Sequence, residues 1–490
     1  MDNKIRLPIG RSDYKTIIDN GCLYIDKTGM IADVIDNDIP VSLFTRPRRF
    51  GKTLNMSMLR TFFEKEKESS ARYFENKIIW QMGEKYRREQ GKYPIIYLSF
   101  KDVKYKSFDL SYGAVISLIA DEFGRHREIM PVLSDENRVY YKKILEKKAT
   151  QNEYGESLRK LSEFLNNFYG EPVVLLIDEY DTPLQNAYIE GYYDDMISFI
   201  RPFLSGGLKD NANLKYAFLT GIMRVAKESV FSGLNNLCVY SILDEKFSTY
   251  FGFTAEDVGY ISEKCNVQEK LPEIREWYDG YIFGNTEMYN PWSVLSYLDS
   301  GCLAVSHWGN TSSNDILRQS IKQADSGTIG KIRDLYDGKT VKSIIDPSIS
   351  YGDMQKNKSL VFSFLAISGY MKCFNRQIFD GKFYCDIEIP NREIKSIYKE
   401  EIIGAIEENF KSDTATLLVS SLVFGDVDSF ASLIKKYLES SVSFFDNNES
   451  FYHGMILGMC VATTNYYKVL SNRESGEGRF DIALFPLQQN

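Results

Sequence analysis

The sequence predicts an α/β fold in which strands of a parallel sheet alternate with helices. Short apolar runs typical of buried strands occur at Val41–Phe44, Tyr93–Phe100, Val173–Ile177 and Leu214–Gly221. Apolar residues at helical spacing occur between and after these runs, at 54–63, 108–169 and 194–204. Because strands that alternate with helices are joined by crossover connections, this order favours a parallel sheet with helices on its faces.

The composition is that of a globular chain with more than one domain. The chain has 490 residues, of which 43% are hydrophobic and 26% are charged. Single cores seldom grow beyond about 250 residues, so roughly two to four domains are expected. The net charge of −8 gives no overall basic field for nucleic-acid binding. Seven cysteines without a C-x-x-C pair and only three histidines argue against a disulfide scaffold, a zinc site and Ser-His-Asp chemistry.

The polar start Met1-Asp2-Asn3-Lys4 lacks the apolar segment of a signal peptide. A run of about 18 apolar residues, which a membrane-spanning helix needs, does not occur either. The sequence therefore predicts a cytoplasmic protein that does not contact a membrane, and it leaves open whether the chain forms a homo-oligomer.

The loop that follows the first predicted strand has the pattern of a phosphate-binding loop. It runs from Phe44 to Thr53 and ends in Gly51-Lys52-Thr53, directly before the predicted helix 54–63. Backbone N–H groups and a helix N-terminus favour an anion at such a position. A lysine and a hydroxyl there would reach the terminal phosphates and Mg²⁺. Arg46 stands where this pattern usually has its first glycine, so a basic loop that caps a helix is the alternative.

The apolar strand Val173–Ile177 ends in two carboxylates, Asp178 and Glu179. This is the Walker B arrangement, in which Asp178 would hold Mg²⁺ with Thr53, and Glu179 would orient or deprotonate the attacking water. The alternative is a core strand that ends in a solvated acidic turn. Together with the Gly-Lys-Thr loop, the acidic pair predicts a P-loop NTPase core that binds ATP and Mg²⁺. ATP is favoured over GTP because no Asn/Thr-Lys-x-Asp motif occurs.

Further candidate residues follow the strand 214–221. Thr220 lies at its end, where a polar side chain would contact the γ-phosphate or its water. Arg224 follows on the same loop and would stabilise charge in the transition state, although a surface or ion-pair role is the commoner one for a single arginine. Near the N-terminus, Tyr24 would either touch adenine or pack in the core, and core packing is favoured.

A series of motifs in residues 5–300 resembles the bacterial AAA-ATPase-like family. They are Leu7-Pro8-Ile9-Gly10, Tyr24-Ile25-Asp26-Lys27-Thr28, Arg46-Pro47-Arg48-Arg49-Phe50-Gly51-Lys52-Thr53, Ile177-Asp178-Glu179-Tyr180-Asp181, Leu219-Thr220-Gly221, Phe231-Ser232-Gly233-Leu234-Asn235-Asn236 and Trp277-Tyr278-Asp279-Gly280-Tyr281. The arginine in place of the first glycine is a trait of this family. The resemblance implies that all of Arg46, Pro47, Arg48, Arg49, Phe50, Gly51, Lys52 and Thr53 belong to the nucleotide site. Members commonly carry a C-terminal nuclease-like domain of the PD-(D/E)XK type.

Three parts are therefore predicted: an ATPase core at 1–240, a helical lid with a winged-helix-like module at 241–410, and a helical linker with an incomplete nuclease-like α/β domain at 411–490. The aromatic clusters Trp277–Tyr281 and Tyr289–Ser293 would form the core of a lid or joint, or stack on a base. Winged helices bind DNA or proteins, but the modest local charge favours a structural lid here.

The last part matches the nuclease-like domain incompletely. Asp481, in Gly478-Arg479-Phe480-Asp481, matches a metal-binding aspartate, and Glu449 matches a supporting acid on a helix. Such a site needs a second acid and a lysine on the next strand, and no Glu-x-Lys follows Asp481. The nuclease-like part is thus expected to be truncated or degenerate, without cleavage by this chain alone, and contact with nucleic acid would be through this module.

Three functions remain open from the sequence. The first is a Mg²⁺-dependent ATPase that couples ATP binding and hydrolysis to the C-terminal module. The second is a nucleotide-gated switch with little turnover, and the third is the remnant of a defence or mobile-element nuclease. The intact Glu179 favours hydrolysis. Fold-level analogy does not choose among the three.

Overall fold

The computed structural model describes residues 5–224, 236–309, 326–350 and 360–409, and of the rest mainly 425–441, 467–475 and 478–487. The chain forms two compact units, one of Met1–Ser313 with Leu335–Ser396 and the other of Asn314–Asp334 with Ile397–Asn490. The three-part division at residues 240 and 410 stays a prediction. Within the described residues, every helix is too short or too polar to cross a membrane.

A five-stranded parallel sheet forms the centre of the first unit. Its strands are β1 (Val41–Thr45), β2 (Ile95–Ser99), β3 (Val173–Asp178), β4 (Leu214–Gly221) and β5 (Leu237–Tyr240), in the order β2-β3-β4-β1-β5. The predicted α/β class and parallel sheet are confirmed. The sequence did not predict β5, because four half-buried residues are too few to show a period. This order places β4 between the strand that leads into the Gly-Lys-Thr loop and the strand that ends in Asp178.

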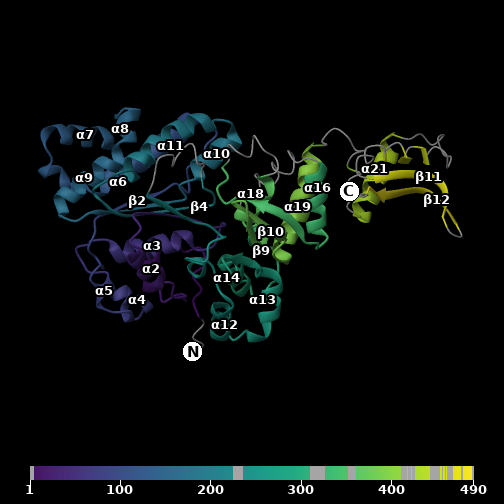
Figure 1. Cartoon of the computed structure of the whole chain (residues 1–490), viewed down its shortest axis with the longest axis horizontal. Coiled ribbons are helices and arrows are strands. Elements are labelled where there is room, and N and C mark those ends of the chain that lie inside the picture. Colours follow the sequence, from purple (N-terminus) through teal and green to yellow (C-terminus); the bar gives the residue numbers. More distant parts are fainter. Residues whose placement is uncertain are drawn as a thin grey trace. The chain divides into compact units, whose positions relative to one another are not determined.

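Helices cover both faces of this sheet (Figure 1). One layer contains α6 (Phe108–Arg125), α7 (Asp135–Leu145), α8 (Gln151–Gly155), α9 (Ser157–Tyr169), α10 (Thr182–Glu190) and α11 (Tyr193–Leu208). On the other side lie α1 (Tyr14–Asp19), α2 (Gly29–Asn37), α3 (Lys52–Phe63), α4 (Ile78–Gln81) and α5 (Glu84–Arg87). One face of the sheet shares a continuous hydrophobic core with α6, α9 and α11. Phe44, Leu176 and Phe218 alternate with these core residues along the strands and are also buried, so the strands are apolar on both faces.

Side chains of α6, and of His126 directly after it, form hydrogen bonds with backbone groups along the outer edge of β2. A carboxylate oxygen of Glu122 accepts the backbone N–H of Tyr97 at 2.8 Å, and Arg125 donates to the carbonyl oxygen of Ile95. His126 contacts the same carbonyl oxygen at 3.0 Å through Nε2. Burial disfavours ionisation of Glu122, but hydrogen bonds from His126 and Arg125 outweigh it and lower the Glu122 pKa to about 2. The helix thus satisfies backbone groups that an edge strand would otherwise expose.

After the sheet, the first unit continues with α12 (Ala255–Lys264), α13 (Leu271–Tyr278), the hairpin β6 (Tyr281–Phe283) and β7 (Thr286–Met288), and α14 (Pro291–Asp299). A three-stranded antiparallel sheet of order β8-β10-β9 follows, with β8 (Val341–Ile345), β9 (Lys372–Phe379) and β10 (Lys382–Glu388). The helix α18 (Val361–Ile367) also belongs to this unit. Two further helices extend across the boundary between the units: α16 (Ser326–Tyr336) crosses it after Asp334, and α19 (Arg392–Asn409) crosses it after Ser396. The strands β9 and β10 form a hairpin, and the residues of its tight turn, Asp380 and Gly381, both have positive φ.

Glu393 ties α19 to the region of α14. Its carboxylate accepts Ser293 Oγ at 2.8 Å and the backbone N–H groups of His307 and Trp308, both at 2.8 Å. Burial raises the pKa of Glu393 to about 7, although these three hydrogen bonds oppose the shift. A buried carboxylate with three donors therefore joins three separate chain segments.

The second unit contains α21 (Val427–Ser441) and an antiparallel hairpin of β11 (Tyr467–Ser475) and β12 (Gly478–Pro486). Asp481 lies on β12 with an exposed side chain, and its carbonyl oxygen contacts His453 Nε2 at 3.0 Å. Glu449 lies outside the described residues. A nuclease-like fold for this unit stays a prediction.

Replacing Glu122 by alanine is expected to destabilise the first unit by about 3–5 kcal/mol. The reason is that Arg125 loses a buried ion-pair partner and the backbone N–H of Tyr97 loses its hydrogen-bond acceptor. Urea unfolding followed by circular dichroism measures the loss. Glu84→Ala, which breaks an exposed i,i+4 pair with Arg88, should cost no more than about 0.5 kcal/mol. Equal losses in the two variants would contradict the role of Glu122 at the sheet edge.

The raised pKa of Glu393 predicts a pH-dependent stability. Because the folded chain binds this proton more tightly than the unfolded chain, stability falls as pH rises from the ordinary value of 4.5 through about 7. The loss from this group is on the order of 3 kcal/mol. Glu393→Gln should remove this part of the pH dependence, as measured by urea unfolding at pH 5 and pH 8. An unchanged difference between the two pH values would show that Glu393 does not carry it.

Candidate functional site

The loop between β1 and α3 borders a cavity of about 420 Å³. Gly51 caps α3 in the left-handed region, with φ 80°, and α3 begins at the next residue, Lys52. The first N–H groups of α3 have no partner within the helix, so an anion is favoured there. Of the loop, residues 48–53 line the cavity. The sequence therefore folds locally as predicted, into strand, loop and helix.

Lys52 points into the loop. Its ammonium group is buried and donates to the carbonyl oxygens of Arg46 at 3.0 Å and Pro47 at 2.8 Å. Burial lowers the pKa of Lys52, and the negative charges of Glu179 and Asp181 oppose this shift. The two carbonyl contacts hold the ammonium group at the cavity wall.

Two threonine hydroxyls converge on the buried carboxylate of Asp178. Thr53 Oγ1, on α3, donates to Asp178 Oδ2 at 2.7 Å, and Thr220 Oγ1, on β4, donates to Asp178 Oδ1. Burial raises the pKa of Asp178, and the charge of Glu179 adds to this effect. The strand order explains the contact, because β4 lies between β1 and β3 and brings Thr220 to both. The Thr220 hydroxyl thus holds Asp178, and its expected contact with the γ-phosphate or its water stays a prediction.

Glu179 lines the cavity beside this group. Its backbone N–H donates to Thr220 Oγ1 at 3.3 Å, and its carboxylate accepts Thr182 Oγ1 at 3.2 Å. Its φ of 52° lies in the left-handed region, as does the φ of 69° at Arg49, which also lines the cavity. Non-glycine residues adopt this region at a cost, and they concentrate at functional sites.

Asp181 is a residue of the site that the sequence analysis did not predict. Its buried carboxylate accepts the backbone N–H groups of Ile222 at 2.8 Å and Met223 at 3.0 Å. Burial raises its pKa to about 6, although the two backbone hydrogen bonds oppose the shift. Asp181 lines the cavity and fixes the turn that follows β4. A third acid two residues after Glu179 was the available signal.

The side chain of Arg46 is not among those that line the cavity, and its place in a nucleotide site stays a prediction. The guanidinium is fully buried and donates to the carbonyl oxygens of Tyr240 at 2.8 Å and Phe247 at 3.4 Å. It also lies over the rings of Phe251 and Phe283 at 5.0 and 5.3 Å. Desolvation lowers the pKa of Arg46 to about 9. Arg46 therefore fastens the loop to the segment after β5, and only its carbonyl oxygen contacts Lys52.

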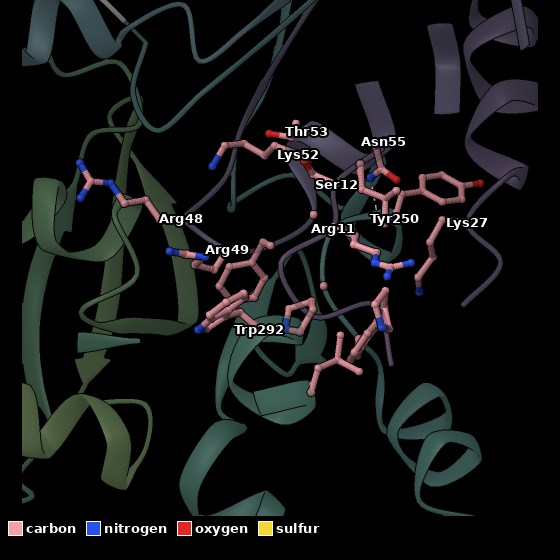
Figure 2. A pocket seen from close by; sticks show the side chains of 18 of the residues that line it. Arg11, Ser12, Lys27, Arg48, Arg49, Lys52, Thr53, Asn55, Tyr250 and Trp292 are labelled. Carbon is pink, nitrogen blue, oxygen red and sulfur yellow. Dashed lines mark hydrogen bonds between the residues drawn. The ribbon is translucent and has the colours of Figure 1, made fainter. Parts of the chain in front are cut away.

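The remaining loop side chains separate into distinct environments. Phe50 is buried against Tyr281 and Phe283, with ring centroids 4.9 and 5.0 Å away. Figure 2 shows Arg49 over the indole of Trp292, while Arg48 extends away from the other labelled residues. Arg49 and Arg48 both line the cavity.

Residues far from the loop in sequence complete the cavity wall. They come from the N-terminal segment, from the loop before α6, from α10 and from the region of α12 and α14, and they include Pro8, Arg11, Ser12, Tyr24, Lys27, Lys104, Gln185, Tyr250, Phe253, Ile261, Pro291, Trp292 and Leu295. Tyr24 reaches the cavity and also packs, since its hydroxyl lies 3.4 Å from the sulfur of Met58. Of these residues, the sequence singled out Tyr24 as a candidate for adenine contact. Pro8 and Lys27 belong to motifs of the family resemblance, and Pro291 and Trp292 belong to the aromatic cluster.

Arg224 ends the described stretch 5–224, and it is not among the described residues that line the cavity. Its Nε is buried without a hydrogen-bond partner among the described residues. Of the motif Phe231–Asn236, only Asn236 is described. Asp481 belongs to the second unit, and Glu449 lies outside the described residues.

Replacing Gly221 by alanine should disrupt the turn after β4. The added Cβ would lie 2.7 Å from Asp181 Oδ1 and 2.7 Å from a ring carbon of Tyr180, so an overpacking cost of about 1–3 kcal/mol is expected. Thermal and urea unfolding measure it. Gly113→Ala, on α6 where nothing lies within 4 Å, should be neutral or stabilising by up to about 1 kcal/mol. A Gly221→Ala variant as stable as Gly113→Ala would contradict the packing argument.

Comparisons with known proteins match the part of the chain that contains this site. Residues 8–231 match the family model described as a predicted AAA-ATPase. A protein of Azotobacter chroococcum mcd 1, named as an uncharacterized protein in the vnfD 5′ region, is 29% identical over 292 residues. The aligned part covers 59% of this chain and 51% of that relative, so the chain spans about half the length of the curated relative it matches. Over residues 8–231, the region that contains the loop, Asp178 and Thr220, this chain is similar to the predicted AAA-ATPase family.

Proposed function

We propose that the first unit binds ATP and hydrolyses it with Mg²⁺. The observation that carries this proposal is the 2.7 Å hydrogen bond between Thr53 Oγ1 and Asp178 Oδ2, one residue away from Lys52 at the start of a helix. A hydroxyl and a carboxylate from two different motifs thus meet at the end of a phosphate-binding loop. The match to the predicted AAA-ATPase family supports the same conclusion.

The loop residues supply the binding chemistry for the phosphates. The N–H groups at the start of α3 favour negative charge, and Lys52 would donate to the β- and γ-phosphate oxygens. Arg49 would add a planar cation that suits phosphate oxygens. The cavity of about 420 Å³ lies within the roughly 300–1,000 Å³ of small-molecule sites. Its apolar wall, with Pro8, Tyr24 and Ile261, would surround the base.

Mg²⁺ fits the residues at this place. Thr53 Oγ1 and Asp178 Oδ2 are hard oxygen donors, which Mg²⁺ prefers. Among the described residues no cluster of three or more His, Cys, Asp or Glu side chains could hold a metal alone. Mg²⁺ is usually bound by one or two protein ligands together with phosphate oxygens and water, so the pair of Thr53 and Asp178 suits this ion. When bound, the ion would neutralise charge on the phosphates.

Glu179 supports turnover in addition to binding. Its carboxylate lines the cavity on the Asp178 side and is oriented by the 3.2 Å hydrogen bond from Thr182. There it would orient a water molecule toward the γ-phosphate and accept its proton. Thr220 would act indirectly, because it holds Asp178 and the Glu179 backbone. Coupling of turnover to the C-terminal residues is part of this proposal, since α19 begins in the first unit and continues past Ser396 into the residues of the second.

Lys52→Ala and Glu179→Gln separate binding from hydrolysis. Lys52→Ala should weaken ATP binding by roughly 10- to 100-fold, because a charge-assisted contact to phosphate is lost. Glu179→Gln should bind ATP as the wild type does but release phosphate about 100-fold more slowly, or slower still. Isothermal titration with ATP and Mg²⁺ and a phosphate-release assay measure the two properties.

Lys142→Ala, on an exposed face of α7, is the matched lysine control and should change neither property. Equal ATP affinity in Lys52→Ala and the wild type would refute the nucleotide site. Binding without phosphate release by the wild type would favour the nucleotide-gated switch over the ATPase.

A further inference from the structure

We propose that Trp292, on α14 and outside the matched residues 8–231, is a positioning residue that holds Arg49 against the nucleotide phosphates. The inference deepens the proposed function and rests on it. It assigns a role to the aromatic cluster Tyr289–Ser293, for which the sequence left two alternatives, a lid core and a surface that stacks on a base.

The contact between the two side chains is close. The guanidinium carbon of Arg49 lies 4.2 Å from the centre of the Trp292 ring, and both residues line the cavity (Figure 2). Tryptophan offers the strongest aromatic face for a cation, and the attraction grows when the pair is shielded from water. Arg49 is half buried, and burial lowers its pKa although the charge of Glu179 opposes the shift. The pair thus lies on the wall that faces the proposed phosphate site.

The indole is itself held in place. Its Nε1 donates to the carbonyl oxygen of His307 at 3.3 Å, and the N–H of His307 donates to Glu393. The next residue, Ser293, donates to the same Glu393 carboxylate, and Asn290 caps the start of α14. Trp292 therefore presents a fixed surface on a fixed helix. A long arginine side chain that rests on it loses less entropy when it binds phosphate.

Two neighbouring groups bear on the role of Trp292: the carboxylate of Glu179 and the Arg49 guanidinium on the indole face. Glu179, the carboxylate proposed to orient water, lines the same cavity, and its charge opposes the lowering of the Arg49 pKa by burial. The indole face would hold the Arg49 guanidinium in place, so that the Glu179 carboxylate stays available to orient water. Arg49 covers one face of the Trp292 indole, so that face is not open to stacking on a base. The geometry therefore favours positioning of Arg49 over stacking on a base.

A double-mutant cycle tests the inference in the full chain, with the dissociation constants of Mg²⁺-ATP and of Mg²⁺-tripolyphosphate, which has no base, as readouts. Arg49→Ala should weaken the binding of both ligands by roughly 10- to 100-fold. Trp292→Leu should weaken the binding of both by roughly 3- to 30-fold. The double variant should bind within about twofold of Arg49→Ala alone, because Trp292 acts through Arg49.

The controls separate positioning from folding. Trp292→Phe keeps an aromatic face and should lose no more than about threefold, and it takes the place of Trp292→Leu in the cycle if the leucine variant melts early. Trp80→Leu removes a comparable ring, which Arg87 covers at 5.6 Å outside the cavity, and should leave both affinities unchanged.

Each other outcome overturns the inference in a distinguishable way. Additive losses, or a Trp292→Leu effect on ATP that is absent with tripolyphosphate, would mean that the indole contacts the nucleotide itself. If Trp292→Leu bound both ligands with the affinity of the wild type, Trp292 would not position Arg49 for binding. A wild-type chain that binds neither ligand would remove the nucleotide site and the proposed function together.

Discussion

The burial of the Asp178 carboxylate is the constraint on which the rest of the site depends. A charge without exposed surface is costly unless its oxygens are hydrogen-bonded, and the hydroxyls of Thr53 and Thr220 supply these bonds from two different elements. The two hydroxyls can converge only if the start of α3 lies beside the carboxyl ends of β3 and β4. The strand order β2-β3-β4-β1-β5 satisfies this requirement, because β4 lies between the two strands that carry the loop and the acid.

The same sheet edge carries a second set of constraints. Tyr180 donates its hydroxyl to the carbonyl oxygen of Met223, and Asp181 binds the N–H groups of residues 222 and 223. Gly221 has to lack a side chain, because these two residues occupy the space of a Cβ. The turn after β4 is thus packed against the turn after β3. Movement of one turn would alter the other, which links the position of Glu179 to that of Thr220.

Arg46 and Arg49 show that neighbouring residues of one motif have different tasks. Arg46 is buried under Phe251 and Phe283 and joins the loop to the polypeptide after β5, whereas Arg49 faces the cavity and rests on Trp292. The site is therefore assembled from the sheet and from α14 together. Glu393 connects α14 with α19, so the residues that border the cavity are tied to the helix that continues past Ser396.

The sequence alone determined the elements whose signals are local. Apolar runs predicted β1 to β4, and the Gly-Lys-Thr loop and the Asp-Glu pair located Lys52, Thr53, Asp178 and Glu179, because these patterns depend on neighbours along the chain. The tertiary structure decided the direction of the Arg46 side chain, the contact of Thr220 with Asp178, and the presence of Asp181 and Trp292 at the cavity. Each depends on residues 40 to 240 positions away, such as Arg46 with Tyr240 and Arg49 with Trp292. One sequence carries no signal for such pairs, because burial and strand order arise only when distant segments pack together.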